Sequence, residues 1–123
     1  MIVGIGNDVV EIGRFESFSE NERFIEKYFT QKEIESGNQR GKRKNAFLAA
    51  NFSVKESVSK VFGTGITGFS LIEIEVLRDD NGKPYVNLYG KAKEIADGLN
   101  IKKMHVSITD TDDLVITMAV GED

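Results

Sequence analysis

Residues 44–62 constrain the fold of this chain more than any other segment does. Apolar side chains recur along it at intervals of three and four residues, at Phe47, Ala50, Val54, Val58 and Val61. That spacing places one continuous apolar stripe on an α-helix. The glycine-rich "GTGITG" directly after the segment is typical of a helix end. We therefore expect one long helix whose stripe is buried against the rest of the chain.

The other segments predict strands and shorter helices. The expected strands are residues 2–11, the hairpin of residues 69–77 with a strand near 83–88, and a second hairpin of "KMHVSITD" with "LVITMAV". Two short helices are expected near residues 13–18 and 20–27. A third begins at Thr30, which forms a capping box with Glu33, and a fourth follows "KAKEIADGLN" to Gly98. Residues 36–45 are predicted to form a basic loop. Acidic side chains alternate with apolar ones along residues 69–77, and the acidic ones are expected to be exposed. The chain of 123 residues is then one α+β domain, with a mainly antiparallel sheet packed against one long helix and several short ones.

Composition excludes several kinds of site. The chain has no cysteine and a single histidine, His105, so disulfides, thiolate zinc sites and multi-histidine metal sites are excluded within one chain. A metal would have to be a hard cation bound by carboxylates and water. The net charge of −4 argues against a general nucleic-acid binder. No apolar run approaches the roughly 18 residues of a membrane span, and the N-terminal segment lacks the features of a signal peptide, so a cytoplasmic protein is expected.

The predicted long helix carries a charged pair near its end. Glu56 and Lys60 are four residues apart, in the order that favours a surface ion pair worth roughly 0.3–0.5 kcal/mol. Helical periodicity places both of them, with Ser53, on a flank shared with Phe52 and away from the apolar stripe. Such a flank suits solvent or a cleft equally well. The spacing alone therefore leaves open whether the pair is a salt bridge or part of a site.

Three other features can each be interpreted either as structural or as part of a functional site. Asp8 lies on the strand face that carries Gly4 and Gly6, where a backbone or a ligand can approach closely, but a lone carboxylate at a strand end is often only a turn residue. His105 shares a polar strand face and is either structural or ligand-binding. The basic "GKRK" of residues 41–44 is either a solvated loop or a patch for a phosphate or an acidic partner.

Taken together, these segments form a recognisable pattern. The sequences "GIGNDVVEIGRF", "FSVKESVSKVFGTGI" and "MHVSITD", with "DDNGKPYVNLYGKAKEIA" between the last two, resemble the holo-[acyl-carrier-protein] synthase family. The resemblance covers nearly the full chain in the right order. The combination of D-x-x-x-x-x-R with K-E-x-x-x-K-x-x-G-T-G is specific, whereas either element alone is not.

The resemblance implies a 4′-phosphopantetheinyl transferase that needs Mg²⁺, works in the cytoplasm and forms a homotrimer with active sites between subunits. Such an enzyme transfers 4′-phosphopantetheine from coenzyme A to a serine of apo acyl carrier protein in support of fatty acid biosynthesis, and releases adenosine 3′,5′-bisphosphate. Matched position by position, Asp8 and Glu56 are the expected magnesium ligands, and both are expected to be catalytic together with Lys60. The residues expected to bind coenzyme A are Lys60, Gly63, Thr64, Gly65 and His105.

The carrier protein is expected to bind the early helices. Arg14, Arg23 and Lys27 would face the acidic carrier protein, with Phe15, Phe18 and Phe24 as possible anchors. Three positions depart from the family pattern. Asn51 replaces a common arginine, and Asp110 replaces a common histidine. Val10 is not a carboxylate, so the metal site would have two acidic ligands rather than three.

Two other classes of function compete with this interpretation. One is a module that binds a nucleotide or coenzyme A without catalysis, and the other is a purely structural trimer that binds no coenzyme A. A mass gain on apo carrier protein in the presence of Mg²⁺ and coenzyme A would distinguish the enzyme from both.

Overall fold

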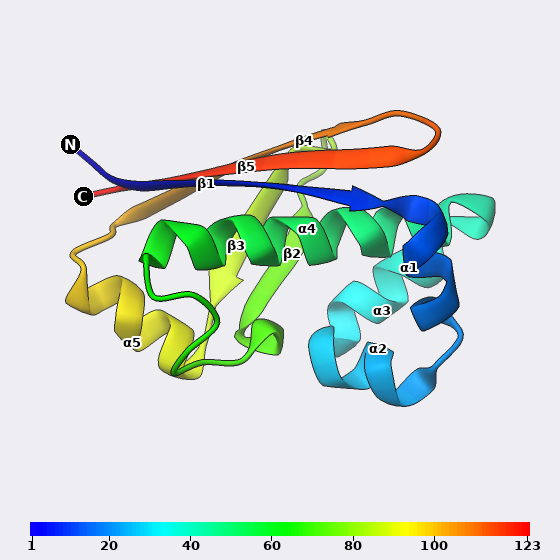
Figure 1. Cartoon of the computed structure of the whole chain (residues 1–123), viewed down its shortest axis with the longest axis horizontal. Helices are drawn as coiled ribbons and strands as arrows, with labels where there is room; N and C mark the ends of the chain where they lie inside the picture. The colour runs from blue at the N-terminus through cyan, green and yellow to red at the C-terminus, as the bar shows by residue number, and fades with distance from the viewer.

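The computed structural model describes all 123 residues and is organised around the predicted long helix. This helix, α4, spans Lys44–Phe62 and ends at Gly63, which adopts the left-handed conformation with φ of 75°. Figure 1 shows α4 running the length of the molecule beneath one sheet, with the short helices grouped near its two ends. The predicted helix and its glycine terminator are both confirmed.

The larger sheet contains three antiparallel strands in the order β1-β5-β4. These strands are β1 (Ile2–Glu11), β4 (Lys103–Asp110) and β5 (Leu114–Glu122). The predicted first strand and the predicted C-terminal hairpin are therefore confirmed. In the register of the sheet, Asp8 of β1 lies opposite Thr117 of β5.

The second sheet is the separate hairpin of β2 (Ile74–Arg78) and β3 (Pro84–Leu88). The expected strand of residues 69–77 is partly wrong, because Leu71–Glu73 form a 3₁₀ turn that Ser70 and Glu73 cap reciprocally. The expected exposure of its acidic side chains is also wrong for Glu75, which is buried. Glu75 accepts hydrogen bonds from the side chains of Thr30, Asn87 and Tyr89, and these bonds replace water around its carboxylate.

Four short helices complete the fold. They are α1 (Ile12–Ser19), α2 (Glu22–Tyr28), α3 (Gln31–Asn38) and α5 (Gly90–Gly98). The capping box of Thr30 and Glu33 at the start of α3 is confirmed. The expected basic loop of residues 36–45 is largely wrong, since α3 continues to Asn38 and a 3₁₀ turn at Gly41–Arg43 leads directly into α4.

Helix α4 is buried on almost all sides rather than along one stripe. The predicted stripe of apolar residues is buried, but so are Asn51, Ser53, Lys55, Ser57 and Ser59. The cause is the position of the helix, which contacts both sheets and the short helices. From Phe47 to the helix end, only Phe52, Glu56 and Lys60 are not buried. They are spaced four residues apart, so the helix reaches the surface along one narrow line.

Candidate functional site

The site is built where strand β1 crosses the open line of helix α4. Two glycines allow this crossing to be close, because a Cβ on Gly6 would lie 2.0 Å from the carbonyl oxygen of Ser57, and one on Gly4 would lie 2.4 Å from that of Val61. Asp8 follows on the same face of β1, as the alternation of strand residues predicted. The backbone approach therefore brings Asp8 against α4.

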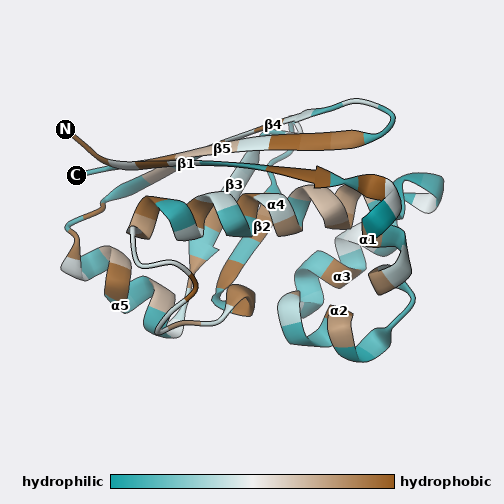
Figure 2. Cartoon of the chain, viewed as in Figure 1, coloured by the Kyte–Doolittle hydropathy of each residue, from teal (hydrophilic) through white to brown (hydrophobic).

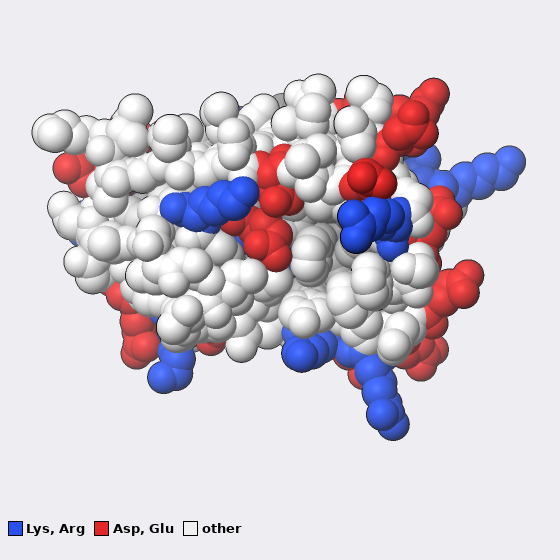
Figure 3. Space-filling view, in the orientation of Figure 1, with Lys and Arg blue, Asp and Glu red and all other residues white.

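Asp8, Glu56 and Lys60 come together at this crossing. Lys60 Nζ lies 3.9 Å from Asp8 Oδ1 and donates a hydrogen bond of 2.7 Å to the carbonyl oxygen of Asn7. The ion pair of Glu56 with Lys60 that their spacing allowed does not form, since the lysine reaches strand β1 instead. In the space-filling view, acidic atoms gather near the middle of the face, at the junction of sheet and helix, with basic atoms beside them (Figure 3).

Both carboxyl groups are partly removed from water. Burial raises the pKa of Asp8, while the hydrogen bond from Ser53 and the charge of Lys60 oppose the rise. Burial also raises the pKa of Glu56, and repulsion from Asp8 adds to it. The two carboxylates thus concentrate negative charge that Lys60, with a side chain 55% exposed, only partly balances.

This donor set fits a hard divalent cation. Two carboxylates supply oxygen ligands, and the described residues bring no third acidic or histidine side chain to them. Mg²⁺ characteristically binds through one or two carboxylates, with waters and substrate phosphates at its other positions. The fold thus brings the two predicted carboxylates close to each other, and their role as metal ligands stays a prediction.

Strand β4 places His105 away from this cluster. Its side chain lies on the opposite face of the sheet from α4, where His105 Nε2 and Glu122 Oε1 are 2.9 Å apart. In contrast, the turn of Gly63, Thr64 and Gly65 begins three residues after Lys60, and both glycines have positive φ. Within one chain, the predicted coenzyme A residues thus divide into a group near Lys60 and a separate histidine.

An apolar pocket of about 370 Å³ adjoins Glu56. Seven of its lining residues are hydrophobic, namely Phe24, Tyr28, Phe52, Ile66, Phe69, Leu71 and Ile72. Sequence reasoning missed this pocket, although Phe52 lies one helical turn before Glu56. The pocket gives the carboxylate site an apolar neighbour that can hold an apolar portion of a substrate.

The residues predicted to bind a carrier protein lie beside this pocket. Arg14, Phe18 and Phe24 help to line a second hollow of about 300 Å³, and the rings of Phe18 and Phe24 stack with centroids 5.0 Å apart. Arg23 is exposed on α2. Phe15 is buried in the core, so the expectation that it could anchor a partner is wrong.

A basic pocket of about 280 Å³ opens beside the start of α4. The guanidinium groups of Arg40 and Arg78 both lie over the Phe47 ring, 4.5 and 4.7 Å from its centroid. Burial, with repulsion from Arg40, lowers the pKa of Arg78 to about 10. Arg43 also lines the pocket and pairs with Asp110 at 3.2 Å. Sequence analysis did not single out Arg40 or Arg78, because residues from α4, β2, β3, β4 and the 3₁₀ turn before α4 create this pocket.

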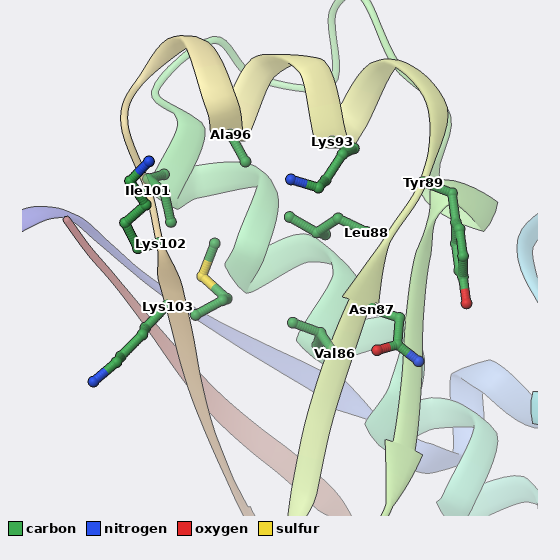
Figure 4. A pocket seen from close by; sticks show the side chains of 10 residues that line it. Val86, Asn87, Leu88, Tyr89, Lys93, Ala96, Ile101, Lys102 and Lys103 are labelled. Carbon is green, nitrogen blue, oxygen red and sulfur yellow. The ribbon is translucent and has the colours of Figure 1, made fainter.

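A further hollow of about 430 Å³ lies at the other end of the molecule (Figure 4). It is lined by the apolar side chains of Val86, Leu88, Ala96, Ile101 and Met104 and by Lys93 of α5. Its β4 residues, Lys103 and Met104, pair with Glu122 and Gly121 near the end of β5, several residues from Thr117, which pairs with Asp8. This hollow is therefore separate from the carboxylate cluster.

Comparison with known proteins identifies the family. A model of the 4′-phosphopantetheinyl transferase superfamily matches residues 4–119. The chain belongs to this superfamily. It is also 45% identical to the holo-[acyl-carrier-protein] synthase of Lachnoclostridium phytofermentans over 122 residues, which cover 99% of this chain and 97% of the relative. As a phosphopantetheinyl transferase, the chain is an enzyme.

Solved structures show the same fold. The holo-[acyl-carrier-protein] synthase of Neisseria meningitidis superposes with a TM-score of 0.91 at 29% identity, covering 100% of both chains. That of Bacillus anthracis, solved in complex with coenzyme A (3′,5′-ADP), has a TM-score of 0.83 at 33% identity, covering 100% of this chain and 98% of the other. The predicted fold class is therefore confirmed. None of the helices is both long and apolar enough to cross a membrane.

Proposed function

We propose that residues 1–123 form one enzyme domain that transfers 4′-phosphopantetheine from coenzyme A to a serine of apo acyl carrier protein. The reaction would depend on Mg²⁺, release adenosine 3′,5′-bisphosphate and serve fatty acid biosynthesis in the cytoplasm. The observation that supports it most directly is the convergence of Asp8, Glu56 and Lys60, from two separate elements, in a chain of this superfamily. The names of its relatives supply the carrier protein and coenzyme A as substrates.

Each residue of the cluster has a distinct task in this proposal. Asp8 and Glu56 would hold the Mg²⁺, which when bound neutralises charge on the pyrophosphate oxygens of coenzyme A. Lys60, whose side chain is exposed, would bind the phosphates on the side of the leaving bisphosphate. In the turn that follows, the Gly63 N–H donates to the Lys60 carbonyl oxygen, whereas the N–H groups of Thr64 and Gly65 make no backbone hydrogen bond and would be available to the same phosphates.

The serine hydroxyl of the carrier protein needs a base. As its oxygen forms a bond to the β-phosphorus, the bond from that phosphorus to the bridging oxygen breaks, and the serine proton must be accepted. We assign this proton to Glu56, directly or through a bound water, because its carboxylate also lines the adjoining pocket and can face an incoming hydroxyl. The adjoining apolar pocket places hydrophobic side chains beside this carboxylate.

The proposal also includes the carrier protein and the oligomer. Arg14, Arg23 and Phe24 would bind the acidic carrier protein, and the hollow that Arg14 and Phe24 share also reaches Phe52, the residue one turn from Glu56. Coenzyme A would contact Lys60, Gly63, Thr64 and Gly65 of one chain. His105 lies on the opposite face of the sheet, so it would reach a nucleotide only from a neighbouring chain of a homotrimer.

Intact mass measurement of apo carrier protein tests the function. With Mg²⁺ and coenzyme A, the wild-type enzyme should add one phosphopantetheine to the carrier. Asp8→Asn and Glu56→Gln should each lower the rate by on the order of 100-fold or more, because each removes a charged ligand from the metal site. Glu94→Gln is the matched control, since Glu94 is an exposed carboxylate of α5 outside the site.

The outcomes separate the competing functions. Full transfer by both site variants would contradict the assignment of Asp8 and Glu56. Binding of coenzyme A without any mass gain on the carrier would indicate a binding module instead. A wild-type protein that binds no coenzyme A would leave only the structural trimer.

A further inference from the structure

Three buried hydroxyl groups extend from Asp8 into the interior of the protein. Ser53 Oγ lies 2.9 Å from Asp8 Oδ2, and Thr117 Oγ1 lies 2.8 Å from Ser53 Oγ. Ser57 Oγ lies 2.7 Å from Thr117 Oγ1. All three residues are at most 1% exposed, so no bulk water competes for these hydrogen bonds.

The direction of each hydrogen bond in this hydroxyl chain follows from the first one, between Ser53 and Asp8. An ionised carboxylate only accepts hydrogen bonds, so the single hydroxyl proton of Ser53 is donated to Asp8. Ser53 Oγ must then accept from Thr117, which leaves Thr117 to accept from Ser57. The three protons therefore all point toward Asp8, and hydrogen bonds aligned in this way polarise and strengthen one another.

The backbone geometry of β1, β5 and α4 allows this hydroxyl chain to form. Thr117 lies directly opposite Asp8 in the β1–β5 register, and both side chains face α4. Gly6 lets β1 approach so closely that a Cβ there would lie 2.0 Å from the Ser57 carbonyl oxygen. A side chain at that position would separate β1 from α4 and move Asp8 away from Ser53.

The two oxygens of Asp8 have different surroundings as a result. Oδ2 faces the hydroxyl chain, whereas Oδ1 faces Lys60 Nζ at 3.9 Å, toward the open side of the site. A carboxylate without such a partner could rotate and present either oxygen, or both, to a cation. The hydroxyl chain fixes one orientation.

We propose that Ser53, with Thr117 and Ser57 behind it, is a positioning residue that holds Asp8 Oδ2 toward the interior and leaves Oδ1 as the single oxygen for a divalent cation. The identity of the cation site rests on the proposed function. The hydroxyl chain itself rests only on the contacts between these side chains. Outer partners of metal-binding side chains characteristically change metal affinity by about 10–100-fold.

Direct measurement of Mn²⁺ binding tests the proposal without relying on transfer activity. Mn²⁺ can be titrated in the presence of coenzyme A and followed by electron paramagnetic resonance of the free ion. We expect Ser53→Ala to weaken Mn²⁺ binding by about tenfold. Affinity for coenzyme A in the absence of metal should stay unchanged, because Ser53 lies inside the protein.

Ser59→Ala is the matched control. Ser59 is also a buried serine of α4, 2% exposed, but its hydroxyl donates to the Lys55 carbonyl oxygen at 2.8 Å and does not reach the chain. This variant should bind Mn²⁺ as the wild type does. Thr117→Val and Thr117→Ser form a second pair, in which only valine removes the hydroxyl. The valine variant should lose affinity and the serine variant should retain it.

The results separate this proposal from the proposed function. Equal Mn²⁺ affinity for the Ser53→Ala, Ser59→Ala and wild-type proteins would overturn the positioning role. If Ser53→Ala fails to fold, the Thr117 pair decides, and equal affinities within that pair would overturn the role in the same way. Failure of the wild type to modify apo carrier protein would instead refute the proposed function, and the Mn²⁺ comparison would still be interpretable.

Discussion

Lys55 and Glu56 are neighbours in the sequence with opposite surroundings. Glu56 lies on the open line of α4, whereas the Lys55 side chain is fully buried. Lys55 Nζ donates to Glu33 Oε1 at 2.8 Å and to the carbonyl oxygens of Leu71 and Ile74. Burial lowers the pKa of Lys55, while the charge of Glu33 opposes this change. The buried pair ties α3 and the 3₁₀ turn before β2 to the helix that carries Glu56.

Removing only the lysine should therefore destabilise the protein strongly. Lys55→Met leaves the Glu33 carboxylate buried without its cation, and breaking such a pair costs about 3–5 kcal/mol of unfolding free energy. Urea denaturation followed by circular dichroism measures the loss. The double variant Lys55→Met with Glu33→Gln should lose less than Lys55→Met alone, because it leaves no unpaired charge. Lys91→Met, at an exposed position of α5, should be close to wild type, and a similar loss there would contradict this account.

At the level of elements, the sequence predicted the apolar part of α4 but not its polar part. The spacing of Val54, Val58 and Val61 reveals the buried stripe, and "GTG" reveals where the helix ends. The burial of Ser53 and Lys55 could not be predicted, because their partners Asp8, Thr117 and Glu33 come from distant segments. The same reason explains why Asp8 and Glu56 could be paired only through a family resemblance, since no local spacing connects β1 with α4.

Helices α1 and α2 present the face proposed for the carrier protein. Arg14 and Arg23 are exposed on these helices, beside the stacked rings of Phe18 and Phe24. The chain as a whole carries a net charge of −4, so an acidic partner would be repelled except where such local basic groups face it. These helices also carry exposed Glu16, Glu20, Glu22 and Glu26, so attraction of an acidic partner depends on Arg14 and Arg23 facing it beside the aromatic rings.

Charge reversal on this face should weaken carrier binding selectively. We expect Arg14→Glu to raise KM for apo carrier protein on the order of tenfold or more, because like charges then meet across the interface. The KM for coenzyme A should not change, and added salt should reduce the difference between variant and wild type. Lys102→Glu reverses an exposed charge away from α1 and α2 and serves as the control. Equal effects of the two reversals on the carrier KM would rule out this docking face.

At the scale of the whole molecule, one face of the larger sheet has no cover. Helix α4 and the short helices lie on the other side, as Figure 1 shows. Apolar side chains nevertheless remain exposed on β1 and β5, at Val3, Ile5, Val9, Ile116 and Met118. Brown apolar segments run along both strands in Figure 2, and the band over the sheet in Figure 3 is mostly uncharged. Contiguous apolar surface of this kind marks an interface, which supports the proposed homotrimer.

A charge on this face should therefore separate the subunits. Met118 lies on the central strand β5 opposite Asn7, and its side chain is 52% exposed, so an aspartate there adds charge without disturbing the core of one chain. We expect Met118→Asp to sediment as a single chain of 13.7 kDa, whereas the wild type sediments as a trimer. Leu99→Asp, which charges an exposed apolar residue at the end of α5, should leave the trimer intact. Because the proposed active sites lie between subunits, transfer to the carrier should fall together with the trimer. A fully active Met118→Asp monomer would show instead that one chain contains the complete site.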